Sequence, residues 1–361
     1  MNNNKPIITP PIRQHNQGGQ RLENVAVIRP ILVVLLVFYH AFAIYGGAWE
    51  PIEGFPEIKA YWWLDWFAFA CMLETFVFVS GYVFGYQVRT KGEVKLRAKS
   101  LFVGKLKRLM LPCAIFSLLY ILIFGNITQP IGGTLYAMVN GYAHMWFLPM
   151  LFWCFVLIWI IEILRIKPKY VIPVLVILSL FAVNGLPLQL SHTMYYMVFF
   201  YTGYALQRYD VSLEKYYTKQ NAIVTVLAFI LLFVVLTLLK ENRDLIFTSP
   251  SVIVQTGKFV IGKICMLVYS GAGIIMLMIV VGYIQKSSDL KVPRWIIEVG
   301  NLCFGVYLFQ QFILQAIYYY TDMPKFMGAI FTPWVGFVFA LIGSLLLTWL
   351  CRLTRVGRSI L

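Results

Sequence analysis

Long apolar runs separated by short polar connections repeat along the whole chain. The residues within a run such as ILVVLLVF do not alternate between apolar and polar, as those of a transmembrane barrel strand would. Apolar runs of about 20 residues are typical of helices that cross a bilayer. The pattern predicts an all-α polytopic membrane protein with about ten transmembrane helices, at residues 25–45, 62–87, 109–124, 143–164, 170–184, 193–207, 221–240, 259–284, 294–320 and 330–351.

The basic residues divide unevenly between the connections of these spans. If the N-terminus is cytoplasmic, 23 of the 30 lysines and arginines fall in cytoplasmic segments. Membrane proteins retain basic residues on the cytoplasmic side, so the split predicts cytoplasmic N- and C-termini and an even number of spans. We expect a disordered cytoplasmic tail at residues 1–20, a transmembrane domain at 21–352 and a short cytoplasmic tail at 353–361.

The composition excludes an ordinary soluble domain, because 60% of the residues are apolar and only 12% are charged. Soluble chains carry roughly 25% charged residues. The net charge of +15 would also suit a nucleic-acid-binding protein, but cytoplasmic retention of basic residues accounts for it, so we expect membrane lipid and no nucleic acid as a partner. The six cysteines lack CxxC spacing and are interpreted as small core residues, and the sequence has no set of His and Glu at metal-ligand spacing.

The first predicted helix carries two basic side chains, Arg29 and His40, at the two ends of the run RPILVVLLVFYH. Eleven positions at roughly 100° per residue put both on one helix face, about 16 Å apart along the axis. An ionisable residue that faces lipid costs roughly 2.5 kcal/mol or more, so both are expected to face protein or a wet cavity. We interpret the pair as a candidate site. The structural alternative is that Arg29 snorkels to the membrane surface and Pro30 kinks the helix.

The second predicted span contains a carboxylate, Glu74, inside an apolar stretch. Glu74 is either one half of a structural pair between helices or an acid that orients His40 or keeps it charged. Gly81 and Gly85 form a small-xxx-small pattern, which predicts a close contact with another helix. Ser80 beside them is interpreted as a packing serine and is kept as a candidate for substrate contact.

The segment 89–112 is rich in basic residues and is predicted to be a cytoplasmic loop. It either anchors the protein to anionic lipid or attracts the phosphates of an anionic donor, with Lys105 and Arg108 as contacts. His144 and Trp146 lie at the outer end of the fourth predicted span. Trp146 suits a membrane interface, and His144 is a candidate for a second proton-handling or acceptor-binding group.

These motifs resemble the acyltransferase 3 family, integral-membrane acyltransferases that modify cell-surface polysaccharides and related glycans. The resemblance covers most of residues 21–351, and its most specific part is the family's Arg-x10-His signature in the first helix. The chain departs from the family pattern at Ala26, Pro30 and Gln310, where aspartate, glycine and histidine are common. The matching residues are Arg29 with His40, Glu74 to Tyr82 (ETFVFVSGY), Lys105 to Pro112 (KLKRLMLP), His144 to Leu148 (HMWFL), and Gly300-Asn301 to Tyr307-Leu308.

The resemblance implies an O-acyltransferase of the cell (plasma or inner) membrane. Its donor would be a cytosolic acyl-CoA, acetyl-CoA by default, with no permanently bound cofactor or metal, and its acceptor a hydroxyl of a surface glycan or a lipid-linked saccharide. His40 would be the general base, Glu74 would orient it or balance its charge, and Arg29 would bind donor phosphate or stabilise the oxyanion. The residues that would contact donor or acceptor are Lys105, Arg108, Ser80, His144 and Trp146.

Two other functions fit the pattern. A secondary transporter or flippase of glycan-related solutes would also use intramembrane charges, but the sequence lacks the two matching halves with broken helices expected of one. An inactive acyltransferase-like scaffold is the second alternative, based on the departures at Ala26, Pro30 and Gln310. The acyl group, the acceptor position and the oligomeric state stay open at this point.

Overall fold

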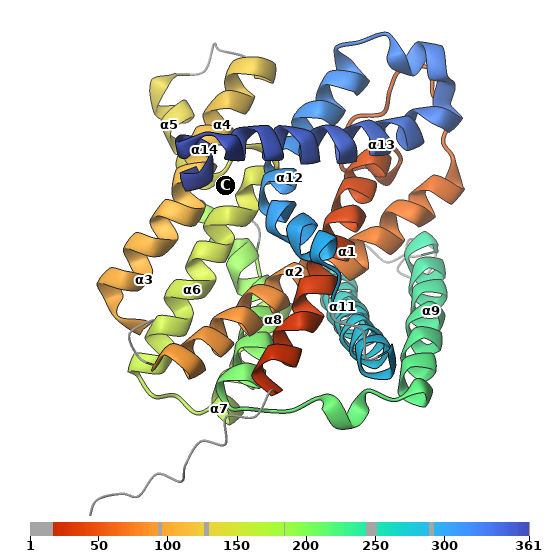
Figure 1. Cartoon of the computed structure of the whole chain (residues 1–361). Helices are drawn as coiled ribbons and strands as arrows, with labels where there is room; N and C mark the ends of the chain where they lie inside the picture. Colours follow the sequence, from red (N-terminus) through yellow and green to blue (C-terminus); the bar gives the residue numbers. More distant parts are fainter. Residues whose placement is uncertain are drawn as a thin grey trace, which may run out of the picture.

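The chain folds into helices joined by short connections (Figure 1). The computed structural model describes residues 17–92, 96–125, 130–183, 185–242, 251–288 and 292–360, with the backbone alone at residues 17–22, 71 and 252–253. These ranges contain no strand, which confirms the all-α prediction. The α-helices are α1 (Gln17–Gly46), α2 (Lys59–Lys91), α3 (Ala98–Lys105), α4 (Leu111–Phe124), α5 (Ile131–Asn140), α6 (Phe147–Ile163), α7 (Pro168–Leu180), α8 (Leu190–Arg208), α9 (Lys219–Glu241), α11 (Val252–Ser288), α12 (Arg294–Tyr319), α13 (Met323–Leu353) and α14 (Arg355–Ile360).

Eight helical stretches in the described part of the chain are long and apolar enough to cross a membrane, and each matches one of the ten predicted spans. The other two predicted spans, 170–184 and 193–207, form α7 and α8. Helix α7 has 13 residues, about 20 Å, which is shorter than the ~30 Å of bilayer hydrocarbon. Helix α8 begins with LSHT, in which three of the four residues are polar. A count of ten crossings therefore stays a prediction, as does the orientation of the termini.

The basic segment 89–112 is largely helical, so its prediction as a loop was wrong. Helix α2 continues to Lys91, and one helical stretch of 27 residues runs over Ala98–Phe124. Lysine and arginine are good helix formers, and charge alone does not end a helix. Pro112 lies in the first turn of α4, and the turn before it widens into a π-helix, Leu106–Met110, because proline has no N–H to donate.

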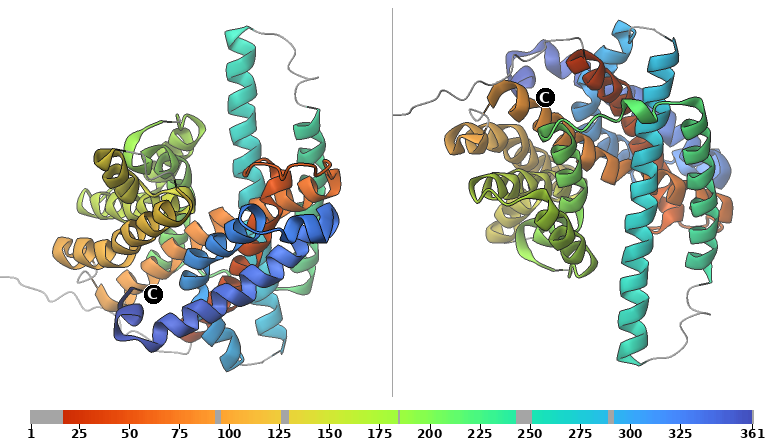
Figure 2. Two further views of the ribbon diagram at one scale, coloured as in Figure 1. Left: turned by 90° about the horizontal axis from the view of Figure 1, so that it is seen from above. Right: turned by 90° about the horizontal axis from the view of Figure 1, so that it is seen from below.

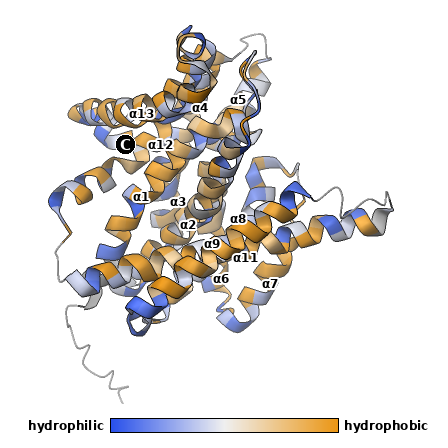
Figure 3. Cartoon of the chain, turned by 90° about the vertical axis from the view of Figure 1, so that its right-hand side faces the viewer, coloured by the Kyte–Doolittle hydropathy of each residue, from blue (hydrophilic) through white to orange (hydrophobic). Residues whose placement is uncertain are grey.

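Helices α1, α2 and α12 form the centre of the bundle (Figure 1). Helix α2 packs along α1 and α8, while α12 packs against α1 and α13. Helix α11 pairs with α9 and also contacts α2, and α6 and α7 pack on α8. One end of α11 projects beyond its neighbours in both views of Figure 2. Hydrophobic residues dominate the helices, and hydrophilic residues gather toward the helix ends and connections (Figure 3).

Helices α2 and α8 approach each other closely at glycines. A Cβ atom on Gly81 would lie 2.0 Å from the carbonyl oxygen of Phe200, and one on Gly203 would lie 2.1 Å from that of Phe78. A Cβ on Gly85 would lie 2.3 Å from another backbone oxygen of α8. These distances confirm the close helix contact predicted at Gly81 and Gly85, and they show that Gly203 supplies the matching surface.

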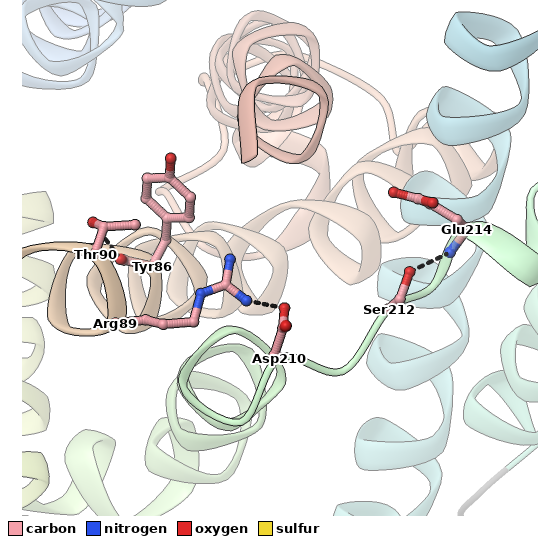
Figure 4. Close-up of polar contacts among 6 residues, drawn as sticks. All are labelled: Tyr86, Arg89, Thr90, Asp210, Ser212 and Glu214. Carbon is pink, nitrogen blue, oxygen red and sulfur yellow. Dashed lines mark hydrogen bonds and ion pairs between the residues drawn. The ribbon is translucent and has the colours of Figure 1, made fainter. Parts of the chain in front are cut away.

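At one end of the bundle, polar contacts tie the connection after α8 to its neighbours (Figure 4). Arg89 of α2 forms an ion pair with Asp210, and the backbone N–H of Glu214 donates to the Ser212 hydroxyl over 3.3 Å. Lys286 of α11 donates to the Glu214 carbonyl over 3.4 Å. We call this the basic end, formed by the described parts of the connections, at residues 92, 96–97, 164–167, 209–218 and 292–293.

At the opposite end of the bundle, aromatic side chains join helices and connections through hydrogen bonds. Tyr319 donates its hydroxyl hydrogen to the Glu50 carbonyl over 2.6 Å, which joins the end of α12 to the connection after α1. Trp63 Nε1 donates to Glu241 over 2.6 Å, and Lys59 pairs with the same carboxylate at 3.0 Å. We call this the aromatic end, formed by the described parts of the connections, at residues 47–58, 125, 130, 141–142, 181–183, 185–189, 242, 251 and 320–322.

The two predicted tails differ in what the structure covers. Residues 1–16 of the tail predicted at 1–20 lie outside the described residues, and α1 begins at Gln17. The tail predicted at 353–361 contains the short helix α14.

Among the described cysteines, Cys113, Cys154 and Cys303 are buried free thiols, as expected of core residues.

Gly203→Ala should destabilise the protein, because its methyl group would meet the Phe78 carbonyl across the contact between α2 and α8. Such overpacking costs typically about 1–3 kcal/mol. Gly132→Ala is the matched control, since a Cβ there meets nothing within 4 Å, and alanine is the better helix former. Thermal unfolding in detergent should give a lower midpoint for Gly203→Ala alone. Equal midpoints for the two variants would contradict the close packing.

Candidate active site

Arg29 and His40 lie on one unbroken helix. Helix α1 runs through Pro30 without interruption, so the predicted helical spacing of the two side chains holds. Gly300 of α12 lies against this part of α1, where a Cβ would be 3.5 Å from the Ala26 carbonyl oxygen and 3.8 Å from the Pro30 ring. The proline is therefore covered by α12 and does not end the helix.

A cavity of about 400 Å³ lies where α1, α2 and α12 meet the turn η3 (Ala143–Trp146). His40 and His144, which are far apart in the sequence, both border it, and they are only 8% and 5% exposed. The connection after α1 contributes Trp49, so the cavity lies toward the aromatic end. The other polar or aromatic lining residues include Tyr39, Tyr120, Trp146, Tyr307, Gln311 and Gln315.

His144 is held by hydrogen bonds to α12. Its Nε2 atom lies 3.2 Å from the Leu308 carbonyl oxygen, and Tyr307 donates its hydroxyl hydrogen to the His144 carbonyl over 2.7 Å. Trp146 lies in the same turn, and its ring packs against the imidazole ring of His192, with the ring centres 4.3 Å apart. The turn that carries His144 is thus fixed at both its backbone and its side chain.

The contact with Leu308 determines which nitrogen of a neutral His144 carries the proton. A carbonyl oxygen can only accept, so Nε2 must donate, and Nδ1 then keeps its lone pair. Nδ1 of His144 is buried without a hydrogen-bond partner among the described residues, and so is Nδ1 of His40. The cavity therefore borders two buried imidazoles, and the Nδ1 atom of each lacks a close hydrogen-bond partner in the described part of the chain.

Glu74 is fully buried, but its contacts lead away from this cavity. Tyr195 of α8 donates to Oε1 over 3.3 Å, and Oε2 lacks a partner among the described residues. Glu74 does not line the cavity, although its neighbours Met72 and Leu73 do. The contact seen at Glu74 is thus an interhelical hydrogen bond to Tyr195, while its predicted action on His40 stays a prediction.

Arg29 lies apart from the two histidines. It is half-buried near Cys303 of α12, and no described carboxylate forms an ion pair with it. Close by on α12, Arg352 of α13 donates to the Asn301 carbonyl over 3.0 Å. Arg29 is separated from His40 by about 16 Å along α1. A ligand that reaches both must be extended.

The remaining predicted site residues lie outside the cavity. The ammonium group of Lys105 is 3.3 Å from the centre of the Phe155 ring, a cation–π contact, and Arg108 is exposed. Ser80 donates to the Phe76 carbonyl over 2.9 Å within its own helix, as expected of a packing serine. The structure thus brings together His40, His144 and Trp146, and it places Arg29, Glu74, Ser80, Lys105 and Arg108 elsewhere.

The comparison with known families decides the identity of this chain. A family model described as an acyltransferase domain, Acyl_transf_3, matches residues 22–353. The chain belongs to the acyltransferase 3 family. Searches of curated proteins and of solved structures found no match. Family membership and the membrane-spanning helices together support a multi-pass membrane acyltransferase.

Sequence reasoning missed several residues that line the cavity of this acyltransferase, notably Trp49, Tyr120, Gln311 and Gln315. The glutamines gave a usable signal, because polar amides inside an apolar span usually face protein. Their neighbour Gln310 is fully buried, with both amide atoms unpaired among the described residues. Trp49 and Tyr120 gave no usable signal in the sequence, since aromatic residues are common at membrane interfaces.

A double-mutant cycle should show that Glu74 and Tyr195 are coupled. Tyr195→Phe leaves a buried carboxylate oxygen without its donor, so it should lower the free energy of unfolding by about 1–3 kcal/mol. The loss should persist in a Glu74→Gln background, where an amide oxygen still accepts, and vanish in Glu74→Leu. Unfolding in mixed micelles measures these values. An equal loss in all three backgrounds would mean that the two side chains do not interact.

Proposed function

We propose that the protein is an O-acyltransferase of the cell membrane. It moves an acyl group, acetyl by default, from a cytosolic acyl-CoA to a hydroxyl of a surface glycan or a lipid-linked saccharide. One observation carries the proposal. His40 and His144 border one cavity, and each has a buried ring nitrogen without a partner among the described residues. An acyltransferase needs such a base beside a space for two substrates.

In the proposed reaction the acceptor hydroxyl oxygen attacks the carbonyl carbon of the thioester. A carbon–oxygen ester bond forms and the carbon–sulfur bond breaks. His40 takes the hydroxyl proton and returns it to the departing sulfur, so CoA leaves as a thiol. His144 borders the same cavity and holds the acceptor or shares the proton. Its fixed contact with Leu308 suits this role, because positioning of reacting groups accounts for much of a catalyst's effect.

Cations toward the basic end suit the donor. Arg29 is half-buried and pairs with no described carboxylate, so its charge is available to a phosphate of CoA. The predicted alternative, that it stabilises the oxyanion, requires a contact of about 3 Å beside His40, which its place outside the histidine cavity does not allow. Arg108 is exposed, whereas Lys105 lies against the Phe155 ring, which favours Arg108 as the donor contact of these two. Clustered cations also raise the local concentration of an anionic ligand. Under the predicted orientation, donor and acceptor then enter from opposite ends.

Replacement of either cavity histidine should abolish most acyl transfer. His40→Gln and His144→Gln remove groups that move or orient a proton, and loss of a general base costs about 10²–10⁴-fold in rate. His15→Gln, which precedes α1, is the matched control and should retain wild-type activity. Ester-linked acyl groups are released from the surface glycans of expressing cells by mild alkali and quantified by mass spectrometry, with membrane levels of each variant checked in parallel.

Two outcomes would contradict the proposal in different ways. If wild type adds no base-labile acyl group to any glycan, the enzyme function is wrong, and a transporter or an inactive scaffold takes its place. If wild type acylates and both histidine variants do so equally well, the enzyme function stands and the site is wrong.

A further inference from the structure

A second pocket, of about 570 Å³, lies at the aromatic end between the connection after α1 and the junction of α12 and α13. Its size falls within the range of about 300–1,000 Å³ typical of ligand sites. It lies outside the cavity that His40 and His144 border, and no step proposed so far uses it. The lining residues that matter here are Glu53, Phe55, Tyr318, Tyr319, Asp322 and Lys325.

Trp49 separates this pocket from the histidine cavity. Its ring centre lies 6.1 Å from that of His40, and the two rings are roughly parallel, at 30°. It also lies 6.1 Å from the ring centre of Tyr318 and 6.3 Å from that of Tyr319. Trp49 borders the histidine cavity, whereas both tyrosines border the second pocket. The indole of Trp49 on the side of the histidine cavity and the rings of Tyr318 and Tyr319 on the side of the second pocket therefore form the wall between the two spaces.

The wall is tied to the helix that carries His40. Tyr318 donates its hydroxyl hydrogen to the Ala41 carbonyl over 2.7 Å, directly next to His40 in the chain. Tyr319 donates to the Glu50 carbonyl over 2.6 Å, directly next to Trp49. These bonds join the last turns of α12 to α1 and to its connection. The position of the pocket relative to the His40 imidazole is thereby fixed.

The chemistry of the pocket suits a sugar. Tyrosine and phenylalanine rings offer flat apolar faces for the C–H faces of a pyranose, and carboxylates and an ammonium group offer partners for its hydroxyls. Asp322 and Lys325 form an ion pair at 2.9 Å with side chains 88% and 84% exposed, so a hydrated ligand can reach them. A purely apolar ligand, such as a lipid acyl chain, would form no hydrogen bonds with these charged groups.

We propose that this pocket binds the saccharide acceptor and that Trp49 is a positioning residue that directs one sugar hydroxyl toward His40. The pocket holds one part of the saccharide, and the adjoining sugar unit, which carries the hydroxyl to be acylated, passes the edge of the indole and lies in the histidine cavity. This inference rests on the proposed acyltransferase function and adds the location of the acceptor. It assigns the aromatic end to the acceptor side of the membrane.

A bulky group attached inside the pocket tests the assignment. Cells that express Asp322→Cys are treated intact with a membrane-impermeant sulfonated maleimide and then fed deuterated acetate. Deuterated base-labile acetyl on surface glycans is compared between treated and untreated cells of the same variant, so any effect of the substitution itself cancels. The matched control is Ile131→Cys, whose native side chain is 81% exposed at the same end, on α5. Wild type treated in parallel shows whether native cysteines react.

We expect labelling to reduce new acetylation at least about tenfold in Asp322→Cys and to leave Ile131→Cys unchanged. Labelled Asp322→Cys that acetylates as fast as untreated cells would overturn the pocket assignment. Failure of folded Asp322→Cys to react from outside would also overturn it, because the pocket would not face the acceptor. Absence of acetylation in untreated wild type would instead overturn the proposed function.

Trp49 is tested by a conservative pair. Trp49→Phe keeps an aromatic ring beside His40 and should retain most acetylation. Trp49→Ala removes the part of the wall that faces the histidine cavity and should lower acetylation about tenfold or more at equal membrane level and unfolding temperature. Equal activity of the two variants would show that Trp49 does not position the acceptor.

Discussion

The structure depends on one constraint, which is that bilayer hydrocarbon offers no partner to a polar group. A polar side chain within a membrane helix must therefore turn toward other helices. His40, Glu74, His144 and Gln310 all do so, and each is almost completely buried. The glycine contact between α2 and α8 brings the backbones close enough for Tyr195 to reach Glu74. Packing of small residues and burial of polar ones thus act together.

Local features of this arrangement could be predicted from the sequence. Arg29 and His40 share a helix because helical spacing is a property of one segment, and α1 continues through Pro30. The close approach at Gly81 followed from residue size alone. Eight of the ten spans were found because length and hydropathy are also local. The basic segment 89–112 was predicted to be a loop because most of it lies between two apolar runs, whereas α2 and the stretch from α3 to α4 extend into it as helix.

The pairing of segments far apart in the chain could not be predicted. Glu74 bonds to Tyr195, and His144 bonds to Leu308, 164 positions away. Such contacts depend on which helices are neighbours, and hydropathy does not encode that. Lys105 shows the same limit, because its charge suggested a phosphate site, whereas the packing of α6 places an aromatic ring against it. The sequence could thus indicate which residues are candidates for the site. Their spatial arrangement could be learned only from the folded structure.

Together these features describe an acyltransferase with two ends of different chemistry. The basic end suits an anionic donor, the aromatic end suits a sugar, and the histidine cavity lies toward the aromatic end. In this account the CoA phosphates lie near Arg29, and the pantetheine arm must carry the thioester along α1 to His40. The length of that path, about 16 Å, is within reach of an extended pantetheine arm but not of the acyl group alone.

The most direct test of this account is photocrosslinking with an acyl-CoA that carries a diazirine on its acyl group. Membranes that contain the protein are illuminated, and the adducts are located by peptide mass spectrometry. The account predicts adducts on residues that line the histidine cavity, from α1, η3 and α12, which excess acetyl-CoA suppresses. Adducts confined to other helices, such as α9 and α11, would contradict it.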